Sequence, residues 1–172
     1  MTVAVKKNYP DDAFVELVKN NQGILHKICN LYSSTREDRQ DLYQEIVLQL
    51  WKSFNSFRGD CKITTWMYKI ALNTALTNIK RVKRQPGTTE IDDGILNVAE
   101  KDEKAFDEDD IKILYIAIGR LRDIEKAIIL LYLEDNSYDE IAAIVGITAK
   151  NVSVKLVRIK SKLEQIISSL NK

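Results

Sequence analysis

The residues near the C-terminus that could do chemistry are cations, and their chemistry is the binding of a polyanion. Between Thr148 and Leu163 there are five lysines and arginines and no acid. At about 100° per residue, one stripe of a helix here carries Asn151, Lys155, Arg158 and Lys162. Lysine contacts phosphate as a point charge, and arginine can also hold a guanine edge with two hydrogen bonds. This segment is therefore a candidate DNA-binding helix.

Two helices joined by a tight turn are expected to position this basic stripe. Ser137 can cap the first helix while Glu140 reaches back to the cap nitrogen, and Gly146 suits the turn. Thr148 can cap the second helix, whose apolar stripe lies away from the cations and contains Val152, Leu156, Ile159 and Leu163. The pattern is typical of a helix-turn-helix whose second helix enters the DNA major groove. An ordinary helical hairpin with a solvated basic face is the alternative.

A second basic stripe precedes this motif in the chain. The segment Cys61–Arg84 has six lysines and arginines and no acid, and a helix is expected from about Thr64 to Arg84. One narrow band of this segment presents Lys62, Lys69, Asn73, Lys80 and Arg84. Phe57 and Arg58 lie in the loop before it, and Trp66 lies at the edge of the band. Cations beside aromatic rings suit single-stranded nucleic acid, although Trp66 could instead pack in the core.

An acidic face is predicted on the helix from about Arg36 to Phe54. The same angular count places Asp38, Asp41, Glu45 and Gln49 close together. Asp41 and Glu45 are like charges at i and i+4, which disfavours an isolated helix by a few tenths of a kcal/mol, on the order of 0.2–0.5. The face is either simply solvated or a docking surface for a basic partner.

Composition argues against several classes of function. The 172 residues carry a net charge of +1, but the segment Thr89–Asp110 has ten acids and separates the two basic blocks. The two cysteines, Cys29 and Cys61, form no CxxC motif. The one histidine, His26, is expected on the flank of a helix, where a structural role is favoured over a catalytic one. We therefore expect no metal site, no cofactor and no enzymatic activity. The sequence has no apolar run near 18 residues and no signal peptide, so we expect a cytoplasmic protein.

The periodicity predicts an all-α protein with two small helical domains. We expect a lead-in at residues 1–10, a first domain at 11–85, a flexible acidic linker at 86–108 and a second domain at 109–172. In the second domain, helices near Asp109–Gly119 and after a cap at Asp123 precede the helix-turn-helix. Four helices on one small core is the expected architecture there.

The order of these parts resembles a known family. Glu37–Glu45, Leu50-Trp51, Phe57-Arg58-Gly59 and Thr65–Asn73 resemble the conserved-region-2 signature of bacterial RNA polymerase sigma factors. Ser137–Ala142 and the helix-turn-helix resemble their region 4. No third domain lies between the two parts, and this layout resembles the extracytoplasmic-function group. The resemblance implies a subunit that binds core RNA polymerase through its beta-prime and beta subunits, and promoter DNA as duplex and as melted single strand. It also implies an anti-sigma factor as a further partner, and no insertion into a membrane.

The resemblance also implies site residues. The helix that would dock on polymerase supplies Asp38, Asp41, Leu42, Gln44, Glu45 and Leu48. The loop and helix that would recognise and melt the −10 element supply Phe57, Arg58, Lys62, Thr65, Trp66, Lys69, Asn73, Lys80 and Arg84. The recognition helix that would read the −35 element supplies Lys150, Asn151, Ser153, Val154, Lys155, Val157, Arg158 and Lys162. This helix has lysines where the family often has arginines, so we expect many phosphate contacts.

Two other readings compete with a sigma factor. The first is a stand-alone helix-turn-helix regulator that binds operator DNA as a dimer, which would need neither the Lys62–Arg84 stripe nor the acidic face. The second is an enzyme or helical adaptor with incidental basic faces, which would bind DNA weakly and without sequence preference.

Overall fold

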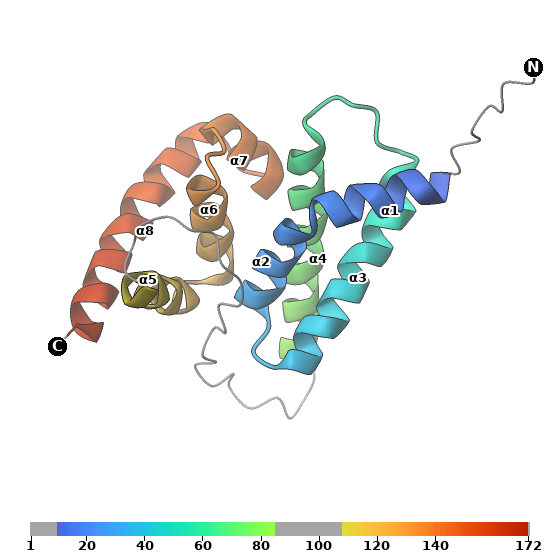
Figure 1. Ribbon diagram of the computed structural model, residues 1–172. Coiled ribbons are helices and arrows are strands. Elements are labelled where there is room, and N and C mark those ends of the chain that lie inside the picture. The colour runs from blue at the N-terminus through green and yellow to red at the C-terminus, as the bar shows by residue number, and fades with distance from the viewer. Residues whose placement is uncertain (1–9, 85–107, 172) are drawn as a thin grey trace, which may run out of the picture.

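The computed structural model describes residues 10–84 and 108–171, and within these ranges it contains eight α-helices and no strand (Figure 1). The helices are α1 (Pro10–Asn20), α2 (Gln22–Tyr32), α3 (Arg36–Phe54), α4 (Ile63–Lys83), α5 (Glu108–Gly119), α6 (Asp123–Leu133), α7 (Tyr138–Val145) and α8 (Ala149–Leu170). The predicted all-α class is confirmed. None of the described helices is both long and apolar enough to cross a membrane.

Local sequence signals set the helix ends. Helix α3 begins and ends where the periodicity predicts, and the Thr35 hydroxyl caps it by accepting the N–H of Asp38 at 3.0 Å. Glu37 and Asp38 in its first turn interact favourably with the positive end of the helix dipole. Helix α4 begins at Ile63 and ends at Lys83, each one residue earlier than predicted.

The predicted helix-turn-helix is confirmed as α7, a turn and α8. The Ser137 hydroxyl accepts the N–H of Glu140 at 3.2 Å, and the Glu140 carboxylate accepts the N–H of Ser137 at 2.9 Å. Gly146 has a φ of 79°, in the left-handed region that favours glycine. Thr148 then caps α8 by accepting the N–H of Asn151 at 3.2 Å. Helix α8 continues past Leu163 to Leu170.

The prediction that Asp123 caps α6 is wrong. Arg122 occupies the N-cap position and Asp123 is the first helical residue. The Asp123 carboxylate instead lies 3.1 Å from the ammonium of Lys83, at the end of α4. The local pattern assigned the Asp123 carboxylate to a helix cap, but this carboxylate pairs with Lys83, which lies 40 residues earlier in the sequence.

Two lobes make up the described structure. In the N-terminal lobe, α2, α3 and α4 pack together with α1 across α3, around Leu25, Ile28, Leu42, Ile46, Leu50 and Met67. In the C-terminal lobe, α5, α6 and α7 pack with α8 around Ile128, Leu131, Ile141, Val152, Leu156 and Ile159. The lobes lie side by side, with α4 against α7 (Figure 1).

Parts of the predicted domain organisation lie outside the described residues. These are residues 1–9 of the lead-in and residues 86–107 of the predicted linker. The domain boundaries at 11–85 and 109–172 remain predictions.

The left-handed turn at Gly146 gives a first testable prediction. A Cβ added at Gly146 meets nothing within 4 Å, so Gly146→Ala should be destabilising only through backbone strain. We expect a loss of about 1–2 kcal/mol in the free energy of unfolding, measured by urea denaturation.

The matched control is Gly23→Ala. Gly23 lies within α2 and a Cβ there also meets nothing within 4 Å. Because its helical conformation suits alanine, this variant should gain about 0.5–1 kcal/mol. Equal effects at the two glycines would contradict the assignment of strain to the turn.

Candidate nucleic-acid interfaces and the acidic face of α3

Helix α8 presents most of its predicted DNA-binding residues to solvent. Lys150, Asn151, Val154, Val157 and Arg158 are exposed, and Ser153 and Lys155 are partly exposed. Val154 and Val157 are 44% and 68% exposed, so both apolar side chains are available to a partner surface. The opposite stripe of Val152, Leu156, Ile159 and Leu163 is buried, as predicted. Burial of that stripe fixes the rotation of α8 and aims the basic stripe outward.

Lys162 is placed differently from the other residues of that basic stripe. Its ammonium lies 2.6 Å from the carboxylate of Glu125, which is only 7% exposed and also accepts the N–H of Arg122 at 3.2 Å. Burial raises the pKa of Glu125, but the hydrogen bonds from Lys162 and Arg122 outweigh it, so its pKa is lowered overall. Lys162 therefore neutralises a buried acid within the lobe and has less freedom to contact DNA.

The loop before α4 and the exposed side of α4 form the second candidate interface. Arg58, Lys62, Lys69, Asn73, Lys80 and Arg84 are exposed. The rings of Phe57 and Trp66 are both partly exposed, and their centroids are 5.2 Å apart. Trp66 also packs against the core cluster, so both roles considered for it are compatible with its position.

Thr65 does not belong to this exposed surface. It is only 7% exposed, because it lies on the side of α4 that faces the lobe interior. Its side chain is buried in this arrangement, and its role as a direct DNA contact stays a prediction.

A groove between α3 and α4 adds residues that the sequence did not single out. Its volume is about 420 Å³, and its polar lining includes Glu45, Gln49, Asn73, Thr77, Asn78 and Arg81. Thr77 and Arg81 follow Asn73 at intervals of four residues, so extending the helical count beyond the lysines would have found them. The groove places Asn73 and Arg81 of α4 beside Glu45 and Gln49 of α3.

The acidic face of α3 is exposed as predicted. Asp38, Asp41, Gln44, Glu45 and Leu48 are all exposed, and Gln49 donates a hydrogen bond to Glu45 at 2.8 Å. Within residues 10–84 and 108–171, no ion pair joins these three acids to a lysine or arginine. Trp51 is also exposed on α3 and packs edge-on against Phe14 at 5.0 Å. Acids without a basic partner among the described residues, beside exposed apolar side chains, suit a docking surface.

Leu42 is not part of that surface. It is 1% exposed and lies in the core beneath the helix. The apolar periodicity of α3 also directs it inward, and its contact with polymerase stays a prediction.

The histidine and the cysteines do not form a reactive site in the described part of the chain. His26 is exposed and stacks on Tyr43, with ring centroids 5.1 Å apart. Burial raises the pKa of the Cys29 thiol to about 12, and Cys61 is a free, exposed thiol. Among the described residues there is no group of three His, Cys, Asp or Glu that could hold a metal ion.

Comparison with protein families gives two matches in chain order. Residues 17–85 match the family model for Sigma-70 region 2, and residues 111–163 match the model for Sigma-70, region 4. The first match covers the acidic face and the α4 stripe, and the second covers α8 as far as Leu163.

Individual proteins agree with the family matches. The chain is 27% identical over 158 residues to the ECF RNA polymerase sigma-E factor of Escherichia coli K12, covering 84% of this chain and 83% of that protein. It is 26% identical over 159 residues to the ECF RNA polymerase sigma factor SigM of Mycobacterium tuberculosis, covering 92% and 79%.

Two solved structures share the fold. The sigma factor RpoE of Bartonella quintana, crystallised with the anti-sigma factor NepR, matches with a TM-score of 0.71 at 20% identity, covering 91% of this chain and 97% of that one. CnrH in complex with the cytosolic domain of CnrY matches with a TM-score of 0.65 at 18% identity, covering 92% and 90%.

The pairing of Lys162 with Glu125 predicts that Lys162 matters mainly for stability. We expect Lys162→Met to lower the free energy of unfolding by about 1–2 kcal/mol near pH 7, less than for a fully buried pair because the lysine is partly exposed. Arg158→Met, on the exposed stripe, should change it by less than about 0.5 kcal/mol. Urea denaturation measures both.

The pH dependence of this loss has a defined sign. The pKa of Glu125 is lowered in the folded chain, so the stabilisation is present above its unfolded pKa and is lost as the pH falls through the folded value. The difference between wild type and Lys162→Met should therefore shrink below about pH 4. A difference that stays constant down to acid pH would contradict the ion pair.

Proposed function

The chain belongs to the sigma-70 family, in the extracytoplasmic-function group of RNA polymerase sigma factors, and we propose that three helix faces divide its work in promoter recognition. The observation that carries the proposal is the order of parts, with an acidic face and a basic stripe within the region 2 match and an exposed recognition helix within the region 4 match. We further infer that the chain forms two domains, at residues 11–85 and 109–172. We also infer that the protein is cytoplasmic and has no enzymatic activity of its own.

The acidic face of α3 is the proposed docking site for core polymerase. The acids Asp38, Asp41 and Glu45 are exposed without a described basic partner, so a basic surface could approach them without breaking an existing ion pair. Leu48 and Trp51 add apolar area that would be buried in the same contact. Charge complementarity would steer the encounter, and the apolar side chains would supply affinity.

The loop 55–62 and α4 are the proposed site for the melted −10 element. Exposed cations along α4 can follow the phosphates of one strand, and the paired rings of Phe57 and Trp66 offer an apolar surface to an extruded base. Unstacking a base costs a few kcal/mol, and stacking on an aromatic ring returns about 1–3 kcal/mol. The groove at Asn73 and Thr77 offers hydrogen-bonding groups beside the same path.

Helix α8 is the proposed reader of the −35 element in duplex form. Arg158 can pair with a guanine edge, whereas Lys150 and Lys155 suit phosphates. The exposed side chains of Val154 and Val157 can contact thymine methyl groups. Lys162, paired with Glu125, takes a lesser part.

An anti-sigma factor is a further proposed partner. The Bartonella structure cited above contains a sigma factor bound to an anti-sigma factor, and the other contains CnrH bound to the cytosolic domain of CnrY. The shared fold supports the same type of regulation here. The dimeric operator-binding regulator is not favoured, because it leaves the region 2 match without a role.

Docking through α3 predicts that reversing two of its charges abolishes binding to core polymerase. We expect Asp41→Lys/Glu45→Lys to stay folded, since both side chains are exposed, and to lose capture of bacterial core polymerase in a pull-down. The matched control is Asp12→Lys/Glu16→Lys, which reverses two exposed acids at the same i, i+4 spacing on α1. Full binding by the α3 variant, or equal loss by both variants, would place the docking site elsewhere.

If α8 recognises the bases of the −35 element, Arg158→Ala should lose promoter affinity in a sequence-dependent way. Losing one arginine–base contact should weaken holoenzyme binding to the cognate promoter by about 1–3 kcal/mol and relax preference at one −35 position. Lys112→Ala, an exposed cation on α5, is the control of equal charge and should leave the −35 footprint unchanged. An unchanged footprint in Arg158→Ala would remove Arg158 from the reading set.

A further inference from the structure

Lys160 of α8 is held in place by a side chain that carries no charge. Its ammonium donates a hydrogen bond to the hydroxyl of Tyr132, near the end of α6, at 2.9 Å. The same ammonium lies 4.2 Å from the centroid of the Tyr132 ring, within the range of a cation–π interaction. The hydrogen bond to Tyr132 is the main reason that the pKa of Lys160 is raised, so the ammonium stays charged at physiological pH. Tyr132 therefore orients this cation without neutralising it.

Other lysines with a hydrogen-bonded ammonium are paired with acids. Each of the following lies within 3.5 Å of a carboxylate: Lys27, Lys62, Lys83, Lys112 and Lys162. The charge of such a lysine is offset by a partner from the same chain. Over residues 10–84 and 108–171, Lys160 is the one hydrogen-bonded lysine whose partner carries no charge. It is therefore both oriented and free to attract an anion.

Lys160 lies at one edge of the exposed face of α8. At about 100° per residue, it lies about 60° around the helix from Val157, and Arg158 lies on the other side of Val157. The contact with Tyr132 shows that this edge is turned towards α6. In a helix-turn-helix the second helix reads base edges in the major groove, and the first helix crosses the DNA backbone. A cation at the edge of α8 is therefore placed to meet a phosphate that borders the groove.

Tyr138 adds a second polar group on the same side of α8. It is the first residue of α7, the helix that would cross the DNA backbone, and it is 41% exposed. An electrostatic interaction with Tyr138 also contributes to the raised pKa of Lys160, so the two side chains are near each other. Tyrosine hydroxyls and lysine ammonium groups both bind phosphate oxygens in protein–DNA interfaces.

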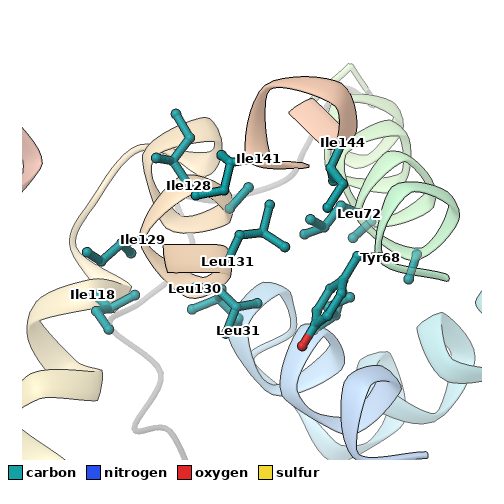
Figure 2. Close-up of a cluster of buried hydrophobic side chains, with 14 of the residues drawn as sticks. Leu31, Tyr68, Leu72, Ile118, Ile128, Ile129, Leu130, Leu131, Ile141 and Ile144 are labelled. Atoms are coloured by element: carbon teal, nitrogen blue, oxygen red, sulfur yellow. The ribbon is translucent and has the colours of Figure 1, made fainter. Parts of the chain in front are cut away.

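The helices that carry the two tyrosines are fixed by one apolar cluster. Leu131 of α6 and Ile141 of α7 lie in this cluster and are fully buried (Figure 2). Tyr132 follows Leu131 directly, and Tyr138 precedes Ile141 by three residues, which is about one helical turn. Packing therefore holds both hydroxyls in defined positions. Side chains that are ordered before binding lose less conformational entropy when a ligand binds.

We propose that Lys160 and Tyr138 bind a backbone phosphate of the −35 duplex, with Tyr132 as the positioning residue that aims the lysine. The site reads no base, and it fixes the register of α8 in the major groove. The proposal rests on the proposed function for the identity of the DNA. A hydrogen bond that only ties α8 to α6 is the alternative, and it predicts a change in stability without a change in phosphate dependence.

Lys160→Met tests whether this lysine contacts a phosphate. Core polymerase would be combined with the full-length variant and titrated onto fluorescent duplex promoter DNA at about 50 and 200 mM salt. Each phosphate contact contributes about 0.9 to the slope of log affinity against log salt, so the advantage of wild type over Lys160→Met should shrink about three- to fourfold between these concentrations. Scrambling the −35 element should weaken both proteins by the same factor, because a phosphate contact carries no sequence information.

Two variants control for charge and for folding. Lys112→Met removes an equal charge from α5, and Lys160→Arg keeps the charge at the proposed site. Both should keep the wild-type salt slope. A wild-type slope in Lys160→Met, or an equal fall in Lys112→Met, would overturn the proposal. So would a lower preference for the intact −35 element in Lys160→Met, since that result would make Lys160 a base-reading residue.

Duplexes with single methylphosphonate linkages, which carry no charge, identify the phosphate. One linkage beside the −35 element should weaken binding by wild type and leave binding by Lys160→Met unchanged. Tyr132→Phe keeps the ring and the lysine charge, so it should lower wild-type affinity only about twofold and have no further effect in the Lys160→Met background. Additive losses from these two substitutions would contradict the positioning role of Tyr132 and overturn the proposal.

Failure of the proposed function has a different signature. If wild-type holoenzyme leaves the −35 element unprotected in a footprint, the proposed function fails and the phosphate site fails with it. If wild type protects the element but every linkage affects wild type and Lys160→Met alike, only the phosphate site is overturned.

Discussion

The burial of one apolar stripe on each of α3, α4 and α8 fixes the direction in which these helices present their charges. On α8, Val152, Leu156 and Ile159 are each at most 1% exposed, and a shift of one residue would turn the helix by about 100° and bury the cations instead. The same constraint holds the acidic face of α3 outward, because Leu42, Ile46 and Leu50 lie beneath it. The functional surfaces are thus set by packing, and their chemistry follows from what the packing leaves exposed.

Features determined within a few residues were predictable from the sequence. The cap of α7, the left-handed turn at Gly146 and the cap of α8 each depend on neighbours no more than four residues away. The limits of α3 followed from a clear apolar period and the Thr35 cap. The basic and acidic faces were also predictable, since the angular position of a residue on a helix depends only on the sequence count.

Features that depend on partners distant in the chain were not predictable. Lys162 was assigned to DNA because its stripe is basic, but Glu125, 37 residues earlier, lies against it. Asp123 has a cap-like position, yet Lys83 pairs with its carboxylate. Thr65 matched a motif by position, and only its burial shows that its side chain points inward. The ion pair between Lys27 and Glu134 joins residues 107 positions apart, for which no local pattern exists.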